Sequence, residues 1–199
     1  MTVTRIFFAV FLLGFPLVLA LKIRAQRRAL GRSPVVLGRV GQGPLELWFE
    51  RLSPLSLLFW PATWLWITLG RVSLSDSPLR ALGLVLIGGG AILSASSVFL
   101  MGRAWRIGID PENRTDLAEH GPYRWIRHPI YSGWLAMLVG HVLVVPHPVV
   151  DVAALLTTAG VVVEALREER HLHRTFGERY ARYARATGRF APRLWGARR

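Results

Sequence analysis

Residues 121–133 read GPYRWIRHPIYSG and stand directly before a long apolar run. Between the two end glycines lie two tyrosines, two arginines, two prolines and a histidine. Pro129 lacks a backbone N–H and disfavours the α region for His128, so we predict a loop that becomes a helix at Pro129. Hydrogen-bond donors, an imidazole and aromatic faces are therefore expected together at a helix N-terminus.

The composition around this stretch is that of a membrane protein. The chain has 199 residues, 52% of them hydrophobic, and its apolar residues form long uncharged runs. We expect one all-α integral membrane domain covering residues 1–199. The net charge of +13 does not indicate nucleic-acid binding, because basic residues that flank membrane spans serve topology and contact anionic lipid. The absence of cysteine excludes disulfides, thiolate metal sites and a cysteine nucleophile.

Five apolar runs predict five transmembrane helices. They cover about residues 6–21, 52–70, 81–102, 129–145 and 149–165. No small-residue cleavage site follows the first run, so we interpret it as a retained span and not as a signal peptide. The last two runs are short for spans, and we favour a spanning hairpin over a re-entrant one. Small residues in the third run, such as Gly90 and Ser94, predict close packing against another helix.

The distribution of basic residues predicts the orientation. The connectors 22–51 and 102–128 and the tail 167–199 hold 22 of the 25 lysines and arginines. Five spans place these segments on one side, which the positive-inside rule makes cytoplasmic, with the N-terminus outside. Within the first connector, Pro44 is predicted to open a short interfacial helix.

A carboxylate pair, Glu168 and Glu169, returns to the same face one hydrophobic hairpin after His128. Ionisable residues at a membrane border are candidates for function. Glu164, Glu168 and His171 share a helix face at i, i+4 and i+7, which suits a cation or a set of hydroxyls. We expect no metal, because neither an HExxH pattern nor a matched histidine pair is present. An arginine–glutamate network that only fixes the tail stays open as an alternative.

At these residues the sequence resembles a known family. RHPIYSG at 127–133, a hydrophobic stretch and then Glu168-Glu169 are similar to the signature of the isoprenylcysteine carboxyl methyltransferases and the related membrane phospholipid methyltransferases. The similarity includes GPYRWIRHP before and FGERYARYARATGRFAP after the signature, and covers residues 110–192. Several separated elements in the same order make this a specific match.

The resemblance implies an integral membrane methyltransferase that uses S-adenosylmethionine in a cytoplasmic pocket and takes a small lipophilic acceptor, isoprenylcysteine-like or lipid, from the bilayer. The implied cofactor-binding positions are Tyr123, His128, Pro129, Ile130, Tyr131 and Glu168, with Thr115, Asp116, Leu117 and Ala118 lining the same pocket. The expected catalytic residues are Arg127, His128 and Glu169, and the expected acceptor-binding residues are Glu164 and Arg167. A sterol-reductase-like enzyme that uses a reduced nicotinamide cofactor, or a non-catalytic membrane scaffold, are the alternatives.

Two positions depart from the family pattern. Glu164 stands where the isoprenylcysteine enzymes have a substrate-binding arginine, and it repels an acceptor carboxylate, although Arg167 is close enough to compensate. Thr115 stands in place of a histidine at the start of the pocket-lining stretch.

The tail is predicted to form a lid over the loop at 121–131. Leu172, Phe176, Tyr180 and Tyr183 make one apolar stripe on an arginine-rich helix that Gly177 is able to interrupt. Anchoring to anionic lipid is the alternative role for this helix.

Overall fold

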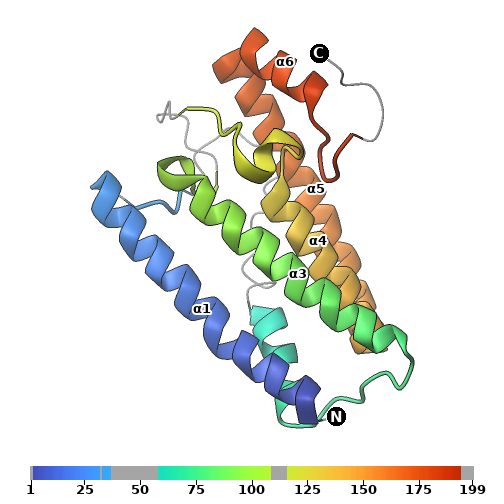
Figure 1. The fold of residues 1–199 in the computed structure, drawn as a ribbon. Coiled ribbons are helices and arrows are strands. Elements are labelled where there is room, and N and C mark those ends of the chain that lie inside the picture. The colour runs from blue at the N-terminus through green and yellow to red at the C-terminus, as the bar shows by residue number, and fades with distance from the viewer. Residues whose placement is uncertain (1, 32, 37–57, 109–115, 194–199) are drawn as a thin grey trace.

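The computed structural model describes residues 2–31, 33–36, 58–108 and 116–193, in which the regular elements are all helices, with no β-strand (Figure 1). The helices are α1 (Thr2–Leu30), α3 (Leu79–Leu100), α4 (Pro129–Val144), α5 (Pro148–Phe176) and α6 (Glu178–Ala186), with the 3-10 helices η1 (Gly102–Ala104) and η2 (Gly121–Arg124). A further helical segment, 58–68, lies between α1 and α3 in the chain. The predicted all-α class is confirmed. The predicted interfacial helix at Pro44 lies outside the described residues.

Glycine contacts hold α3 against α4. A side chain on Gly83 would meet the carbonyl oxygen of Gly140 at 2.8 Å, and one on Gly90 would meet the carbonyl of Gly133. Ser94 Oγ also donates to the Ile130 carbonyl at 2.9 Å. The predicted close packing is therefore confirmed, because only residues without a Cβ let two helix backbones approach this closely.

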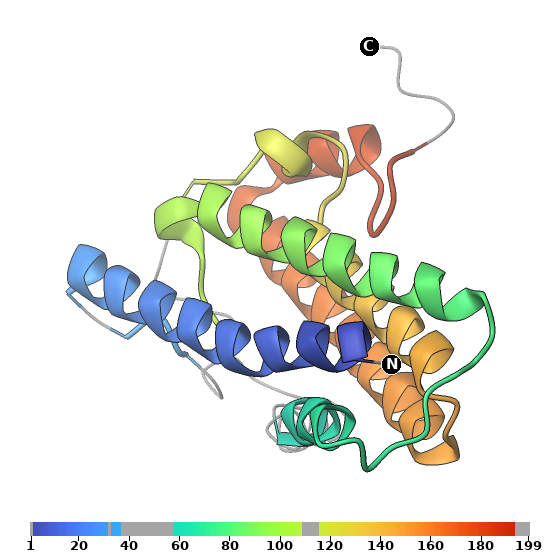
Figure 2. The same cartoon turned by 60° about the horizontal axis from the view of Figure 1, so that its bottom comes forward.

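Helix α1 is longer than its predicted span. The run 6–21 was expected to end at Lys22, but the helix continues to Leu30. Lys22 and Gln26 lie one turn apart on the same face and are buried. The C-terminal part of α1 lies beside the C-terminal end of α3 (Figure 2). Gln26 donates to the carbonyls of Gly102 and Trp105, and Lys22 lies over the rings of Phe99 and Trp105. These contacts offset the cost of burying the two polar side chains. The helix therefore continues beyond the end of its apolar run.

Helix α5 also extends past its predicted span. It was expected to leave the membrane near residue 165 and pass into a tail at 167, but it runs on to Phe176. The stretch after 165 is rich in leucine, arginine and glutamate, which favour helix, and has no glycine before Gly177. At Gly177 the backbone takes φ 49°, so the predicted apolar stripe is divided between α5 and α6.

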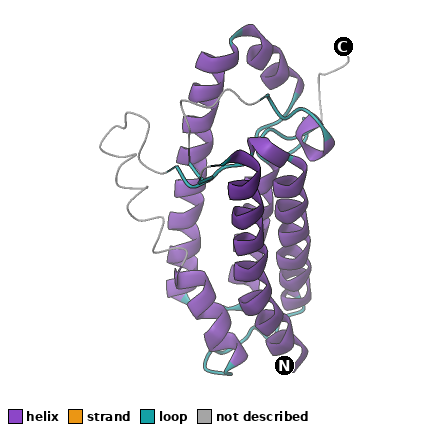
Figure 3. Ribbon diagram, turned by 90° about the vertical axis from the view of Figure 1, so that its left-hand side faces the viewer, coloured by secondary structure: helices purple, strands orange, loops and turns teal. Residues whose placement is uncertain are grey.

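Three described helices are long and apolar enough to cross a membrane, namely α1, α3 and α5, while α4 is apolar but only 16 residues long. The helices run roughly side by side, with loops at both ends (Figure 3). The buried apolar core, which includes Phe8, Trp64, Ile87 and Val144, occupies one end of the bundle. The loop that precedes α4 lies at the opposite end, and α6 folds back over it (Figure 1).

Candidate functional site

The backbone after α6 is paired with the loop before α4. Arg127 N donates to the Gly188 carbonyl at 2.8 Å, and His128 N donates to the Arg189 carbonyl at 3.1 Å. Gly188 N donates in turn to the Trp125 carbonyl, which makes a short parallel bridge. As Pro129 predicts, α4 begins at that residue, with His128 at its N-terminal boundary. The bridge therefore fixes the start of α4 against a segment 61 residues further along the chain.

Tyrosines from α6 pack beneath this bridge. Tyr183 Oη donates to the Tyr123 carbonyl at 2.7 Å, and Tyr180 is fully buried. The Tyr123 hydroxyl itself points to α3 and donates to the Ser97 carbonyl at 3.3 Å. Burial, and after it the charge of Glu168, raises the pKa of Tyr123, so its hydroxyl stays neutral. The predicted packing of the tail on the 121–131 loop is thus confirmed.

Glu169 is held by two arginines. It accepts from Arg127 Nε at 2.9 Å and from Arg189 Nε and Nη2 at 3.0 and 2.7 Å. Arg127 Nη1 also donates to the carbonyls of Ala184 and Thr187 at the end of α6, where a cation is favourable. Arg127 and Glu169 therefore connect the start of α4, α5 and the segment after α6. This is the arginine–glutamate network that was left open as an alternative in the sequence analysis.

Glu168, the other member of the pair, has different neighbours. Tyr131 Oη donates to Glu168 Oε1 at 3.1 Å, and His128 Nδ1 lies 3.2 Å from Glu168 Oε2. No arginine pairs with Glu168 in the described residues, and about a third of its side chain is exposed. Glu168 is thus a positioned carboxylate that keeps an accessible face.

His128 lies between the two carboxylates and is 95% buried. Its Nε2 is 3.4 Å from Glu169 Oε1, outside hydrogen-bond geometry, and has no hydrogen-bond partner among the described residues. Burial lowers the pKa of His128, but the two carboxylates raise it by more, so the pKa lies above its ordinary value. The rings of Tyr131 and Phe190 flank the imidazole.

The structure thus brings together five of the sequence-predicted site residues. They are Arg127, His128, Tyr131, Glu168 and Glu169. Pro129 is buried in the first turn of α4, and Ile130 offers its carbonyl to α3. Asp116 is fully exposed and lies 3.9 Å from Arg179, while Leu117 and Ala118 are half-buried. Thr115 lies outside the described residues.

The predicted acceptor-binding residues form an ion pair on α5. Arg167 Nη1 donates to Glu164 Oε2 at 2.7 Å. Arg167 is buried and Glu164 is partly exposed. The pair partly cancels the charge that Glu164 was expected to present to an acceptor.

Sequence reasoning missed Arg189. It supplies two of the hydrogen bonds to Glu169, but it stands among ten basic residues of the tail with nothing local to single it out. The sequence feature that could have pointed to Arg189 is the motif GRFAP at 188–192. In this motif Arg189 precedes Phe190, whose ring packs against His128.

Two further features bear on ligands. The described residues contain no cluster of three or more histidine, aspartate or glutamate side chains placed to bind a metal.

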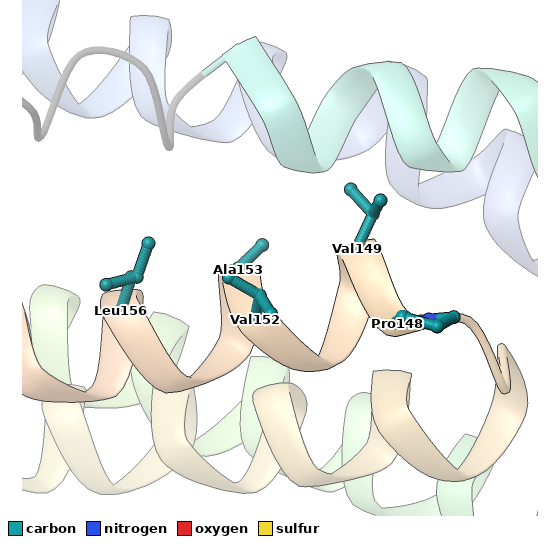
Figure 4. A pocket seen from close by; sticks show the side chains of 5 residues that line it. All are labelled: Pro148, Val149, Val152, Ala153 and Leu156. Atoms are coloured by element: carbon teal, nitrogen blue, oxygen red, sulfur yellow. The ribbon is translucent and has the colours of Figure 1, made fainter.

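A pocket of about 350 Å³ opens along the first half of α5, lined by apolar side chains (Figure 4). Its lining does not include the His128 cluster, so the pocket and the polar site are separate features.

The chain is similar to known membrane methyltransferases. The sequence model of the phospholipid methyltransferase family matches residues 79–179. Protein-S-isoprenylcysteine O-methyltransferase A of Arabidopsis thaliana is 32% identical over 113 residues, which cover 55% of this chain and 57% of the relative. Protein-S-isoprenylcysteine O-methyltransferase of Tribolium castaneum is 28% identical over 121 residues, which cover 59% of this chain and 43% of the relative. The chain therefore spans about half the length of these relatives.

A solved structure shares the fold. It is that of the eukaryotic intramembrane Ras methyltransferase ICMT (isoprenylcysteine carboxyl methyltransferase), which aligns with a TM-score of 0.51 at 23% identity over 77% of this chain and 54% of that chain. The family match covers α3, η2, α4 and α5, the elements that carry the glycine packing and the polar cluster. This chain belongs to the phospholipid methyltransferase family.

Proposed function

We propose that the chain is an integral membrane methyltransferase that transfers a methyl group from S-adenosylmethionine to a small lipophilic acceptor. The observation that carries this proposal is that Glu168 and Glu169 have different hydrogen-bond partners. Glu169 is saturated by two arginines, while Glu168 is positioned by Tyr131 and His128 and keeps an exposed face. A positioned carboxylate without an arginine partner suits a cationic ligand.

The residues fit the cofactor that the family implies. S-adenosylmethionine carries a sulfonium and an ammonium, and Glu168 is able to bind the ammonium or the ribose hydroxyls. The ring of Tyr131 offers an aromatic face for a cation or a base. The Nε2 atom of His128, buried without a hydrogen-bond partner in the described residues, is a further polar group that a ligand satisfies. The cofactor supplies an electrophilic methyl group; the stretch 115–118 and residues 129 and 130 complete its binding region.

The chemistry needs alignment more than proton transfer. A carboxylate or thiolate acceptor attacks the methyl group without losing a proton, so proximity and exclusion of water supply most of the rate. For an amine or hydroxyl acceptor, His128 is the better-placed base, since the carboxylates raise its proton affinity. Arg127 and Glu169 act as positioning residues, because both are engaged in the network that holds the segment after α6.

The curated relatives act on isoprenylcysteine, and the proposed acceptor is accordingly a molecule with an isoprenylcysteine-like carboxylate or a lipid. The proposed architecture is one domain with five spans, the N-terminus outside and the C-terminus cytoplasmic. Reporter fusions at Arg199 and after Ser75 are expected to give opposite locations. Cytoplasmic signals from both fusions would contradict the five-span arrangement.

The direct test is calorimetry of the detergent-solubilised protein with S-adenosylhomocysteine. Glu168→Gln is expected to weaken binding by roughly 1.5–3 kcal/mol, the worth of a charge-assisted hydrogen bond, and to leave the fold intact. Glu178→Gln, at an exposed glutamate on α6, is the matched control and should bind like the wild type. Binding of a reduced nicotinamide cofactor instead would support the sterol-reductase alternative, and binding of neither ligand would support a non-catalytic scaffold.

A further inference from the structure

Lys22 of α1 is a cation whose side chain is folded against two aromatic rings. The residue is 8% exposed. Its Nζ lies 5.3 Å from the centre of the Phe99 ring and 5.8 Å from the centre of the Trp105 ring. The ring faces stabilise the positive charge, but they do not accept its three N–H groups as a carbonyl or a phosphate oxygen does. In the described part of the chain, the ammonium has neither a hydrogen bond nor a counter-anion.

The carbonyl groups of the turn that carries Trp105 serve other donors. Gln26, one turn further along α1, donates to the carbonyls of Gly102 and Trp105 at 3.0 and 2.9 Å. Arg106 Nη1 donates to the Ala104 carbonyl at 3.0 Å. The acceptor that would complete the surroundings of the ammonium therefore comes from outside the protein.

Backbone pairing fixes the ends of α1 and α3 beside each other (Figure 2). Val36 N donates to the Ile107 carbonyl at 2.9 Å, and Ile107 N donates to the Pro34 carbonyl at 3.0 Å, which makes a short parallel bridge. The lysine side chain thus lies between two anchored helix ends. Such a preorganised group loses little conformational entropy when it binds a ligand.

The surface next to Lys22 is apolar and open. Val18, one turn earlier on the same face of α1, is 42% exposed, and Phe99 is 56% exposed. The Nζ atom of Lys22 also keeps some exposure, because it is not among the fully enclosed polar atoms. The ammonium is therefore accessible from the side on which these apolar groups face the surroundings.

Lys22 lies at the level of lipid headgroups. The apolar run 6–21, which ends directly before it, extends about 24 Å as a helix, close to the ~30 Å thickness of the hydrocarbon layer. A lipid whose acyl chains lie beside Val18 and Phe99 would place its phosphate beside the ammonium. Charge and position thus both match an anionic amphiphile.

We propose that Lys22, Phe99 and Trp105 form a binding site for the phosphate of an anionic membrane phospholipid, whose acyl chains lie along Val18 and Phe99. The rings exclude water from the ion pair, which strengthens the attraction between ammonium and phosphate. Lys22 lies outside residues 79–179, which the family model matches, and it does not contact the His128 cluster. The inference therefore does not depend on methyl transfer.

The test measures how added lipid stabilises the purified protein. Protein in neutral detergent is titrated with phosphatidylglycerol or with phosphatidylcholine of the same acyl chains, and thermal unfolding is followed by tryptophan fluorescence. A ligand that binds only the folded protein raises its melting temperature according to its affinity. We expect the wild type to melt several degrees higher with phosphatidylglycerol than with phosphatidylcholine. Lys22→Met should weaken the apparent affinity for phosphatidylglycerol by about tenfold and remove this difference.

Arg24→Met is the matched control. It removes the same charge two residues further along α1, where the side chain is exposed and turned by about 200° from Lys22, and it should keep the phosphatidylglycerol effect. Lys22→Arg, which keeps the charge, should keep most of the preference. Lys22→Gln removes the charge but keeps a polar side chain, so agreement with Lys22→Met excludes a packing effect of methionine. A cooperative melting transition in lipid-free detergent shows that each variant folds.

Three results would overturn the proposal. The first is an unchanged preference for phosphatidylglycerol in both Lys22→Met and Lys22→Gln. The second is an equal loss of this preference in Arg24→Met, which would indicate a general attraction of basic residues to anionic lipid. The third comes from inorganic phosphate at the same concentration, which should not stabilise the protein. If it stabilised the wild type as much as the lipid does, and did so through Lys22, the site would bind a free anion and the lipid assignment would be wrong.

Discussion

His128 and His141 stand at opposite ends of α4 and are both almost completely buried, at 5% and 2% exposure. His141 has a partner for each ring nitrogen, since Trp64 Nε1 donates to Nε2 at 2.7 Å and Nδ1 lies 2.6 Å from the Met137 carbonyl. Trp64 is a donor only and the carbonyl an acceptor only, so His141 is a neutral imidazole protonated at Nδ1. His128 instead faces two carboxylates and leaves Nε2 without a hydrogen bond in the described residues.

The difference separates a histidine with a structural role from the histidine that we propose contacts a ligand. The His141 end of the bundle is largely apolar, packed by Phe8, Trp64 and Ile87, and the hydrogen bond from Trp64 to His141 joins segment 58–68 to α4. The His128 end is polar. Its charged groups come from the loop before α4, from α5 and from the segment after α6, and they balance one another. Burial alone therefore does not identify a functional residue; what distinguishes His128 is its position between two carboxylates.

The largest expected effect comes from removing the segment that closes the polar end. Deletion of residues 177–199 removes Arg189 and Tyr183 and exposes Glu169 without one of its two cations. We expect S-adenosylhomocysteine binding to be abolished while the helices stay inserted in the membrane. Calorimetry and membrane fractionation measure the two properties. If the truncated protein bound S-adenosylhomocysteine with full affinity, α6 would only anchor the chain to anionic lipid, which was the alternative role for the tail.

A change at the apolar end should affect stability and leave the site alone. His141→Ala leaves the Trp64 N–H unpaired and creates a cavity, so we expect a loss of about 2–3 kcal/mol in the free energy of unfolding. Thermal unfolding in detergent, followed by tryptophan fluorescence, measures this loss. A variant with unchanged stability and no cofactor affinity would reverse the assignment of the two histidines.

Glu169→Gln tests whether the saturated carboxylate is a positioning group. The amide still accepts a hydrogen bond but leaves Arg127 and Arg189 without their counter-charge, so we expect about 1–2 kcal/mol of destabilisation. S-adenosylhomocysteine affinity should fall less than in Glu168→Gln. The opposite order of the two affinities would make Glu169 the cofactor-binding carboxylate.

The smallest expected effect is a pH dependence at His128. Because its pKa is raised in the folded protein, the stability that it contributes is fully present below its unfolded pKa of about 6.5 and is lost as the pH rises through the folded value. The difference in unfolding free energy between the wild type and His128→Gln should therefore be on the order of 1 kcal/mol near pH 6 and shrink at higher pH. Melting curves across this range measure it, and a difference that grows with pH would contradict the raised pKa.

Helix limits show where sequence reasoning was incomplete. The apolar runs located the described helices that are long and apolar enough to cross a membrane, but α1 and α5 both continue beyond these runs, to Leu30 and Phe176. Hydropathy measures how favourably a segment transfers into lipid, and it does not determine where a helix ends. A helix ends where a residue such as glycine or a capping group terminates its backbone hydrogen bonding. Gly177 was identified as a possible interruption, and the structure places the break there because its positive φ favours glycine.

The sequence by itself determined the class of the protein, the start of α4 at Pro129 and the return of the carboxylate pair to His128 through the hairpin. These follow from local properties: transfer of apolar runs into lipid, the missing N–H of proline and the length of two helices. Only the tertiary structure decided that Glu169 pairs with Arg127 and Arg189 while Glu168 faces Tyr131, and that Arg167 pairs with Glu164. Successive residues on a helix are turned by about 100°, so three adjacent charges meet three different surroundings, and those surroundings come from parts of the chain that are distant in sequence.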